Sequence, residues 1–184
     1  PKFIILTTSP SMDILISSNL ERLLFELADR DPQRVRGWMR ELSEHGSYTI
    51  DRPQLAVLND LFAAGWCSEQ DTLETIRRTY ERHGYLMDPH TAVAQTVYTR
   101  YAETTGDGTQ TVLLSTANPY KFASDVLSAF ETPGSDDFGN ADRLHALTGM
   151  RVPAGLSELL NKPERHLDVC DLAAMRSRVI APVR

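Results

Sequence analysis

Short apolar runs suggest strands at three places in the chain. Residues 2–8 (KFIILTT), 85–87 (YLM) and 111–114 (TVLL) are apolar, and turn or helix-capping residues follow each of them. Short apolar runs that end at such signals are typical of buried strands. We therefore expect a few short strands.

Most of the other apolar residues recur at helical spacing. Leu20, Leu23, Leu24 and Leu27 follow the i, i+3, i+4, i+7 pattern of a helix with one buried stripe, and Ser18 or Asn19 would cap it. Similar spacing, together with cap and stop residues, predicts further helices over residues 32–42, 53–64, 69–83, 89–104, 119–127 and 141–147, and two short ones after Pro153 and near Asp168.

Two of these helices have a predicted apolar side. In residues 53–64 it consists of Leu55, Leu58, Leu61 and Phe62, and in residues 89–104 of Val93, Val97 and Tyr101. We expect both sides to face the core.

Polar residues follow two of the predicted strands. Ser115 and Thr116 end the run at 111–114, and Asp88 and His90 flank Pro89 at the start of a helix. Ligands of open α/β sheets bind beyond the carboxyl ends of strands, so these side chains are candidates for a site. Turn formation and helix capping are the commoner roles for such residues, and both interpretations remain open.

Composition and charge argue against several classes of function. The net charge of −6 argues against a nucleic-acid surface, and no apolar run approaches the ~18 residues of a membrane helix. Cys67 and Cys170 show no metal-binding or disulfide pattern, so we expect no metal. Lysine occurs only at positions 2, 121 and 162, which matters for any chemistry that needs a Schiff base.

Four segments, in order, resemble threonine synthase, a pyridoxal-phosphate enzyme. They are SPSMDILISSNLERLL (9–24), DPHTAVA (88–94), LSTANPYKF (114–122) and VPAGLSELLNKP (152–163). The resemblance implies an α/β fold of the tryptophan synthase β-like class (fold type II). It also implies that residues 1–184 form the C-terminal portion of the enzyme, with a helical elaboration at about 31–83.

The resemblance also implies a reaction and a set of site residues. Threonine synthase converts O-phospho-L-homoserine and water to L-threonine and phosphate. By the motif match, the Thr116 hydroxyl would meet the pyridine nitrogen of pyridoxal 5'-phosphate, with Ser115 beside it. Asn118 stands where the family usually has His. Further candidates for the substrate pocket are Asp88, His90, Thr91, Asn19 and Lys121.

In the family, the Schiff-base lysine and the phosphate loop precede the SPSMDI segment. Lys121 matches the lysine of a PAKF motif, which is not the cofactor lysine. We therefore expect a cytoplasmic protein whose missing N-terminal part is its partner, and a fragment that alone neither holds the cofactor tightly nor turns over. A noncatalytic relative or regulatory domain is the main alternative. Threonine dehydratase and cysteine synthase are less favoured, because those families lack SPSMDI and DPHTAV.

Overall fold

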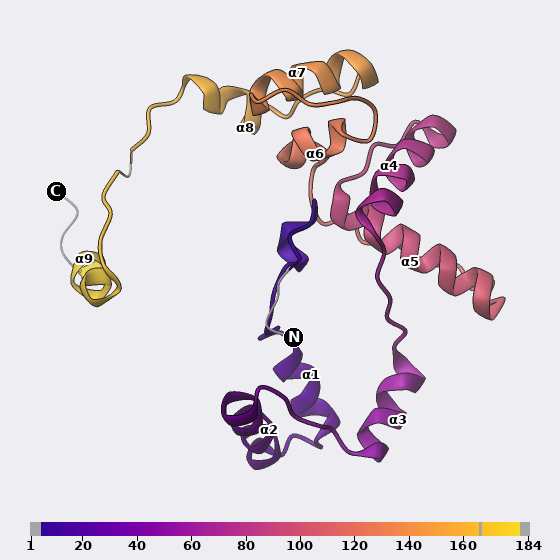
Figure 1. The fold of residues 1–184 in the computed structure, drawn as a ribbon, viewed down its shortest axis with the longest axis vertical. Helices are drawn as coiled ribbons and strands as arrows, with labels where there is room; N and C mark the ends of the chain where they lie inside the picture. Colours follow the sequence, from indigo (N-terminus) through magenta and orange to yellow (C-terminus); the bar gives the residue numbers. More distant parts are fainter. Residues whose placement is uncertain (1–4, 166, 181–184) are drawn as a thin grey trace.

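A computed structural model describes residues 5–165 and 167–180, and the regular structure within them is helical (Figure 1). The helices are α1 (Leu20–Leu27), α2 (Pro32–His45), α3 (Arg52–Leu61), α4 (Glu69–His83), α5 (Pro89–Thr105), α6 (Ala123–Leu127), α7 (Asp137–Thr148), α8 (Ala154–Ser157) and α9 (Met175–Ile180). Single 3-10 turns are η1 (Pro10–Met12), η2 (Pro119–Phe122), η3 (Glu158–Asn161) and η4 (Leu172–Ala174).

Helix ends follow the capping signals in the sequence. The Asp31 carboxylate accepts from two amides at the start of α2, and Ser68 and Asp71 form a capping box on α4. Gly46 and Gly84 end α2 and α4 in the left-handed conformation, where a residue without Cβ is favoured. The predicted start of α2 and both predicted ends of α4 are confirmed, whereas α2 continues to His45, beyond the predicted residue 42.

The larger core lies among α4, α5, α6 and α7. Helix α4 packs along α5, and α6 packs against α7 (Figure 1). The most deeply buried apolar side chains of this core are Ile76, Ala92, Val126, Leu127 and Leu144. Burying each large aliphatic side chain contributes about 1.5–3 kcal/mol, so this cluster fixes the region around the start of α5 and η2.

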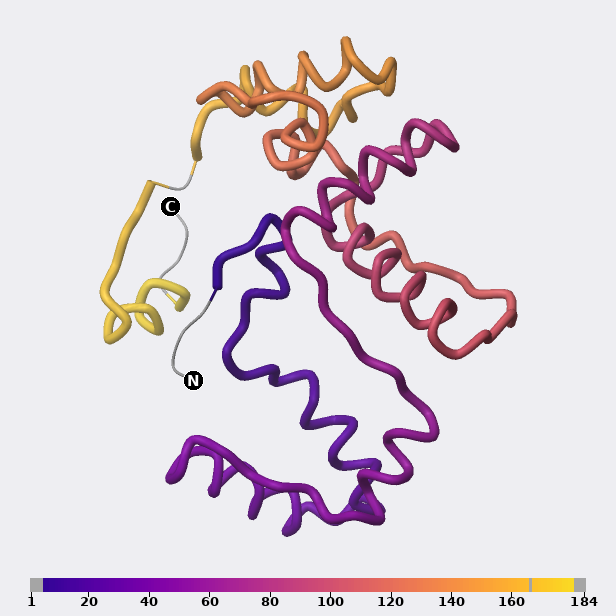
Figure 2. Tube along the Cα trace, turned by 45° about the vertical axis from the view of Figure 1, so that its right-hand side comes forward, coloured from indigo at the N-terminus to yellow at the C-terminus, as the bar shows by residue number. Residues whose placement is uncertain are grey.

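A smaller core lies between α1 and α2, and α1 also contacts α3. This core consists of Leu24, Ala28 and Trp38, with partly buried neighbours around them. Two stretches without regular secondary structure, residues 13–19 and 62–68, connect this group of helices to the larger core (Figure 2). The segment 62–68 leads directly into α4.

The expected strands do not form within the described residues, and this part of the α/β prediction is wrong there. Residues 111–114 have no regular secondary structure and pair with no other described segment, and Val112 and Leu114 are 80% and 76% exposed. A strand is stabilised by hydrogen bonds to a neighbouring strand, which the described residues do not supply. Ile5 and Leu6 are each 80% exposed, and residues 2–4 of the first run lie outside the described residues.

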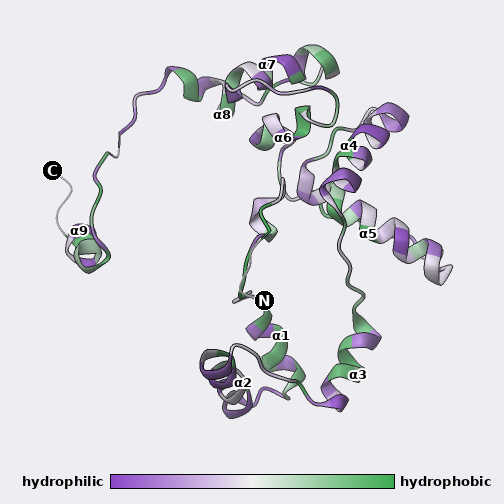
Figure 3. Cartoon of the chain, viewed as in Figure 1, coloured by the Kyte–Doolittle hydropathy of each residue, from purple (hydrophilic) through white to green (hydrophobic). Residues whose placement is uncertain are grey.

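Two predicted apolar faces are also wrong. Hydrophobic residues occur along α3 (Figure 3), but Leu55 and Leu61 are exposed, and the helix ends at Leu61 rather than at residue 64. In α5, the buried side carries Ala92 and Thr96 because α4 packs there. None of the helices in the described part of the chain has both the length and the apolar character to span a bilayer.

Candidate functional site

A groove of about 590 Å³ opens where η1, the start of α5, residues 114–117 and η2 meet. Three residues that the sequence singled out line it: His90, Thr116 and Lys121. Ser11, Val97 and Phe122 complete much of the wall. Segments distant in the sequence therefore converge on one open, largely apolar cavity.

Asp88 organises the start of α5. Its side chain is fully buried, and its Oδ1 accepts from the His90 amide and from His90 Nδ1, each at 3.0 Å. The Thr91 hydroxyl donates to Oδ2. A buried carboxylate is costly unless donors surround it, and here three donors meet the two oxygens. Asp88 therefore caps α5 and also binds the side chains of His90 and Thr91, two other candidate residues.

His90 reaches from α5 to the loop around η1. Its Nε2 accepts from the Ser11 amide at 3.3 Å, and its ring centroid lies 4.9 Å from that of Phe122. Because Nδ1 faces an acceptor and Nε2 faces an N–H, the hydrogen of the neutral ring is on Nδ1. The hydrogen bonds therefore define a single tautomer.

Thr116 lines the groove, and Ser115 precedes it in the chain without lining it. Thr116 is exposed and lines the cavity, and no side chain among the described residues binds its hydroxyl. The Ser115 hydroxyl accepts from Tyr85 Oη at 3.2 Å. The Thr116 oxygen is therefore open to a ligand, whereas Ser115 already has a protein partner.

Lys121 and Asn118 belong to the turn that follows. Asn118 caps η2, because its Oδ1 accepts from the Tyr120 amide at 3.0 Å. The Lys121 ammonium lies 5.5 Å from the centroid of the Phe122 ring and belongs to an exposed residue. A cation is therefore available at the groove wall.

Four candidates do not line the groove: Ser115, Asp88, Thr91 and Asn19. Asn19 precedes α1 without capping it, and its side chain accepts from Arg22 at 3.3 Å. Thr91 is buried against Asp88. Ser11 was not predicted as a site residue, although it belongs to the SPSMDI segment that resembles the family motif.

Gly65, which also lines the groove, was missed as well. A Cβ at this position would lie 2.8 Å from Val97 Cγ1, so the linker can approach α5 closely only with glycine there. A single glycine carries no such information in the sequence.

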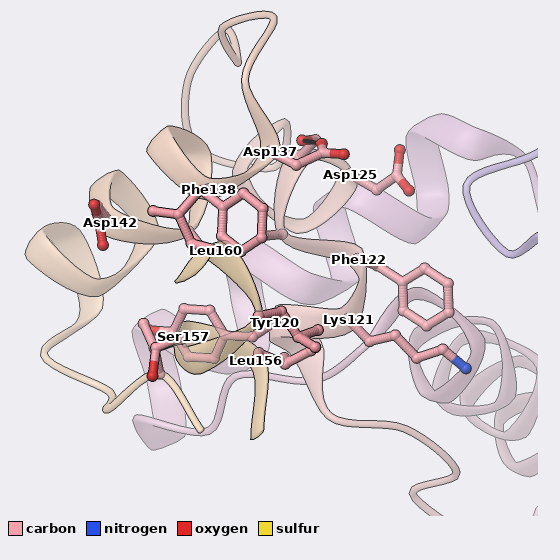
Figure 4. A pocket seen from close by; sticks show the side chains of 15 residues that line it. Tyr120, Lys121, Phe122, Asp125, Asp137, Phe138, Asp142, Leu156, Ser157 and Leu160 are labelled. Carbon is pink, nitrogen blue, oxygen red and sulfur yellow. Dashed lines mark hydrogen bonds between the residues drawn. The ribbon is translucent and has the colours of Figure 1, made fainter. Parts of the chain in front are cut away.

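A second cavity of about 400 Å³ lies between η2, α6, α7 and the α8–η3 segment (Figure 4). Its wall is apolar at Phe138, Leu156 and Leu160, and Asp125 and Asp137 stand at another side (Figure 4). Burial raises the pKa of Asp125, and Glu69 and Asp137 raise this pKa further. Within the described residues, no group of three or more His, Cys, Asp or Glu side chains is placed to hold a metal.

Comparison with known proteins points to one family. The family model described as "Threonine synthase, C-terminal" matches residues 91–179. Human "Threonine synthase-like 1" is 33% identical over 180 residues, which cover 94% of this chain and 24% of that protein. "Threonine synthase" of Saccharomyces cerevisiae is 38% identical over 138 residues, covering 67% of this chain and 27% of the relative.

Two solved structures are similar in fold as well. The pyridoxal-phosphate-bound threonine synthase from Brucella melitensis has a TM-score of 0.70 and 36% identity over 89% of this chain and 31% of that chain. The yeast threonine synthase has a TM-score of 0.77 and 29% identity over 98% of this chain and 37% of that chain. The chain thus spans about a quarter of the length of the curated relatives it matches.

Proposed function

The chain belongs to the threonine synthase family, and from this premise we propose that it is the C-terminal part of a longer pyridoxal-phosphate enzyme. That enzyme would convert O-phospho-L-homoserine and water to L-threonine and phosphate. The observation that carries the proposal is the convergence of His90, Thr116 and Lys121, from two motif segments of the family, on one groove.

The groove fits the aromatic ring of the cofactor. Leu114, Ala117 and Phe122 offer apolar walls for a ring, and the Thr116 hydroxyl at the same wall suits a pyridine nitrogen. When bound, pyridoxal phosphate supplies the electron sink for chemistry at the substrate carbon atoms. Thr116 would hold the ring nitrogen by a hydrogen bond, and Ser115, bound to Tyr85, would support the loop beside it.

The polar residues of the groove have separate proposed roles. Lys121 would attract the phosphate group of the substrate, because a lysine ammonium is a mobile point charge suited to phosphate. Asp88 would hold His90 and Thr91 in place. Asn19 directly precedes α1 and lies outside the groove, so it would meet substrate only if the rest of the protein brought the two together.

The rest of the longer protein would supply what this chain lacks. We propose that the Schiff-base lysine and the cofactor-phosphate loop lie there, together with the strands that pair with residues 111–114. The exposure of Val112 and Leu114 supports this proposal. A cytoplasmic location fits the two free cysteines, Cys67 and Cys170.

A noncatalytic role on the same scaffold is the second candidate. Asn118 replaces the usual histidine of the motif, and in this structure it serves as a helix cap. The human relative and three others are named only "Threonine synthase-like 1". Both observations are compatible with a relative that has kept the fold and lost the reaction.

The test compares this chain with the longer protein that contains it. Mixed with pyridoxal phosphate and borohydride, the chain alone should trap no cofactor. The longer protein should trap it and release phosphate from O-phosphohomoserine. Thr116→Val in the longer protein should shift the cofactor absorbance, whereas Thr109→Val, on an exposed turn, should not. Trapping by the chain alone contradicts the proposed division of the site, and a longer protein without turnover supports the noncatalytic candidate.

A further inference from the structure

We propose that His90 is a positioning residue, which Asp88 orients so that Nε2 holds the Ser11 amide and fixes the loop Thr7–Asp13 as a wall of the groove. The geometry of this link is independent of the reaction. Its effect on substrate binding rests on the proposed function.

The link is well placed to act as a fixed support. The Asp88 side chain is 0% exposed and that of His90 is 10% exposed, so neither is free to change conformation easily. The two Asp88 contacts to His90, to its amide and to Nδ1, hold the ring relative to the helix backbone. Nε2 therefore meets Ser11 from a rigid helix start, across 79 positions of sequence.

Other side-chain hydrogen bonds hold the loop Thr7–Asp13, but those among the described residues do not involve Ser11 or the groove wall. Asp13 accepts from the Thr7 amide and hydroxyl, each at 2.7 Å, and so shapes the loop from within. The Thr8 amide donates to Glu69 on α4 at 2.8 Å. Among the described residues, the contact of His90 with Ser11 is the side-chain link between the loop and the groove wall on α5.

Loss of this link should loosen the wall and leave the rest intact. Ser11 and Met12 line the groove, while Asp13 and Glu69 still hold the beginning of the loop. A typical hydrogen bond contributes about 0.5–1.5 kcal/mol net, which corresponds to about a two- to tenfold change in an equilibrium constant. We expect substrate affinity to fall by this factor.

Two amide variants of His90 test the contacts of Nδ1 and Nε2 separately. In His90→Asn the side-chain amide can take the place of Nδ1 and keep the contact with Asp88, but it cannot reach Ser11. In His90→Gln the longer side chain can place an oxygen near the position of Nε2 and accept from Ser11. His83→Asn, at the exposed end of α4, is the matched control.

The first measurement is hydrogen exchange of the Ser11 amide in this chain. We expect His90→Asn to speed this exchange about two- to tenfold and His90→Gln to restore it, with exchange at Thr96 in the middle of α5 unchanged. Unchanged Ser11 exchange in His90→Asn overturns the inference. If the Asn variant unfolds α5, the Gln variant decides: slow Ser11 exchange supports the link, and fast exchange overturns it.

The second measurement uses the longer enzyme. His90→Asn should raise KM for O-phosphohomoserine about two- to tenfold with kcat nearly unchanged, and His90→Gln should recover most of the loss. Equal defects in both variants contradict a positioning role. If the unaltered enzyme does not turn over, the proposed function fails, and Ser11 exchange alone decides whether the link exists.

Discussion

The side-chain oxygens of Thr75 and Thr96 lie 2.8 Å apart in the buried interface between α4 and α5. The Thr96 hydroxyl also donates to the Ala92 carbonyl at 2.9 Å. Since a hydroxyl has one hydrogen, Thr75 is the donor of the pair and Thr96 is the acceptor. The two threonines are therefore not equivalent.

This asymmetry predicts unequal costs of replacement. Thr96→Val leaves the Thr75 hydroxyl without its acceptor and should lower the free energy of unfolding by about 1–3 kcal/mol. Thr75→Val leaves Thr96 its bond to Ala92 and should cost about 1 kcal/mol or less. The double variant should be more stable than Thr96→Val alone. Urea unfolding of this chain measures all three, and a larger loss from Thr75→Val would contradict the assigned direction.

Asp71 predicts a pH dependence at the start of α4. The pKa of its carboxyl falls from 3.8 to about 2, mainly because Ser68 donates from its hydroxyl and amide, and secondarily because of Arg100. A lowered folded-state pKa stabilises the fold above the ordinary value, and this stabilisation is lost as the pH falls toward 2. Ser68→Ala should raise the Asp71 pKa more than Arg100→Gln does. Carboxyl NMR titration checks the order, and the reverse order would refute it.

Local signals in the sequence were sufficient to predict where α2, α4 and α5 begin, whereas α7 begins at Asp137 rather than at residue 141. Asp31, Ser68 and Asp88 each cap a helix within three residues of their own position, so neighbouring residues carry the information. The buried side of a helix depends on what packs against it. In α5 the sequence favoured Val93 and Val97, yet α4 covers the opposite side, and these two valines line the groove.

The same distinction holds for the site. Thr116 and His90 were predicted from short motifs, and both line the groove. Periodicity gives no indication that His90 would meet Ser11, because that contact depends on how distant segments fold together. The run at Val112 was predicted as a strand, but pairing requires a neighbour that the described residues do not contain.

Replacing Asp125 with Asn should stabilise the fold at neutral pH. Burial, and then Glu69 and Asp137, raise the pKa of the Asp125 carboxyl, so the folded state disfavours its charged form. Stability from this group is therefore greatest below the ordinary value of 3.8 and is lost as the pH rises through the folded-state pKa. Asp125→Asn should raise the melting temperature at pH 7, and the gain should vanish in acid.

The control for this substitution is Asp142→Asn, on the exposed side of α7. Surface substitutions usually change stability by less than about 0.5 kcal/mol, so no comparable gain is expected there. Scanning calorimetry at neutral and acidic pH makes the comparison. A loss of stability in Asp125→Asn at pH 7 would show that the carboxylate is favourable where it stands, against the prediction.

Replacing Val112 and Leu114 should affect the stability of the longer protein but not that of this chain. They are two residues apart in a segment without regular secondary structure, and both are largely exposed in this chain. In a strand, residues two apart face the same side. Replacing both with Ser should reduce self-association and apolar dye binding of the chain and leave its melting temperature unchanged.

In the longer protein, elements packed on the proposed sheet would cover these two side chains. The same double replacement should then cost about 1.5–3 kcal/mol for each buried side chain, because that burial is lost. Denaturant unfolding of the longer protein, with and without the replacements, gives this difference. An equal, near-zero effect in both contexts would mean that the segment stays exposed in the whole protein, and the proposal that residues 111–114 join a sheet would fail.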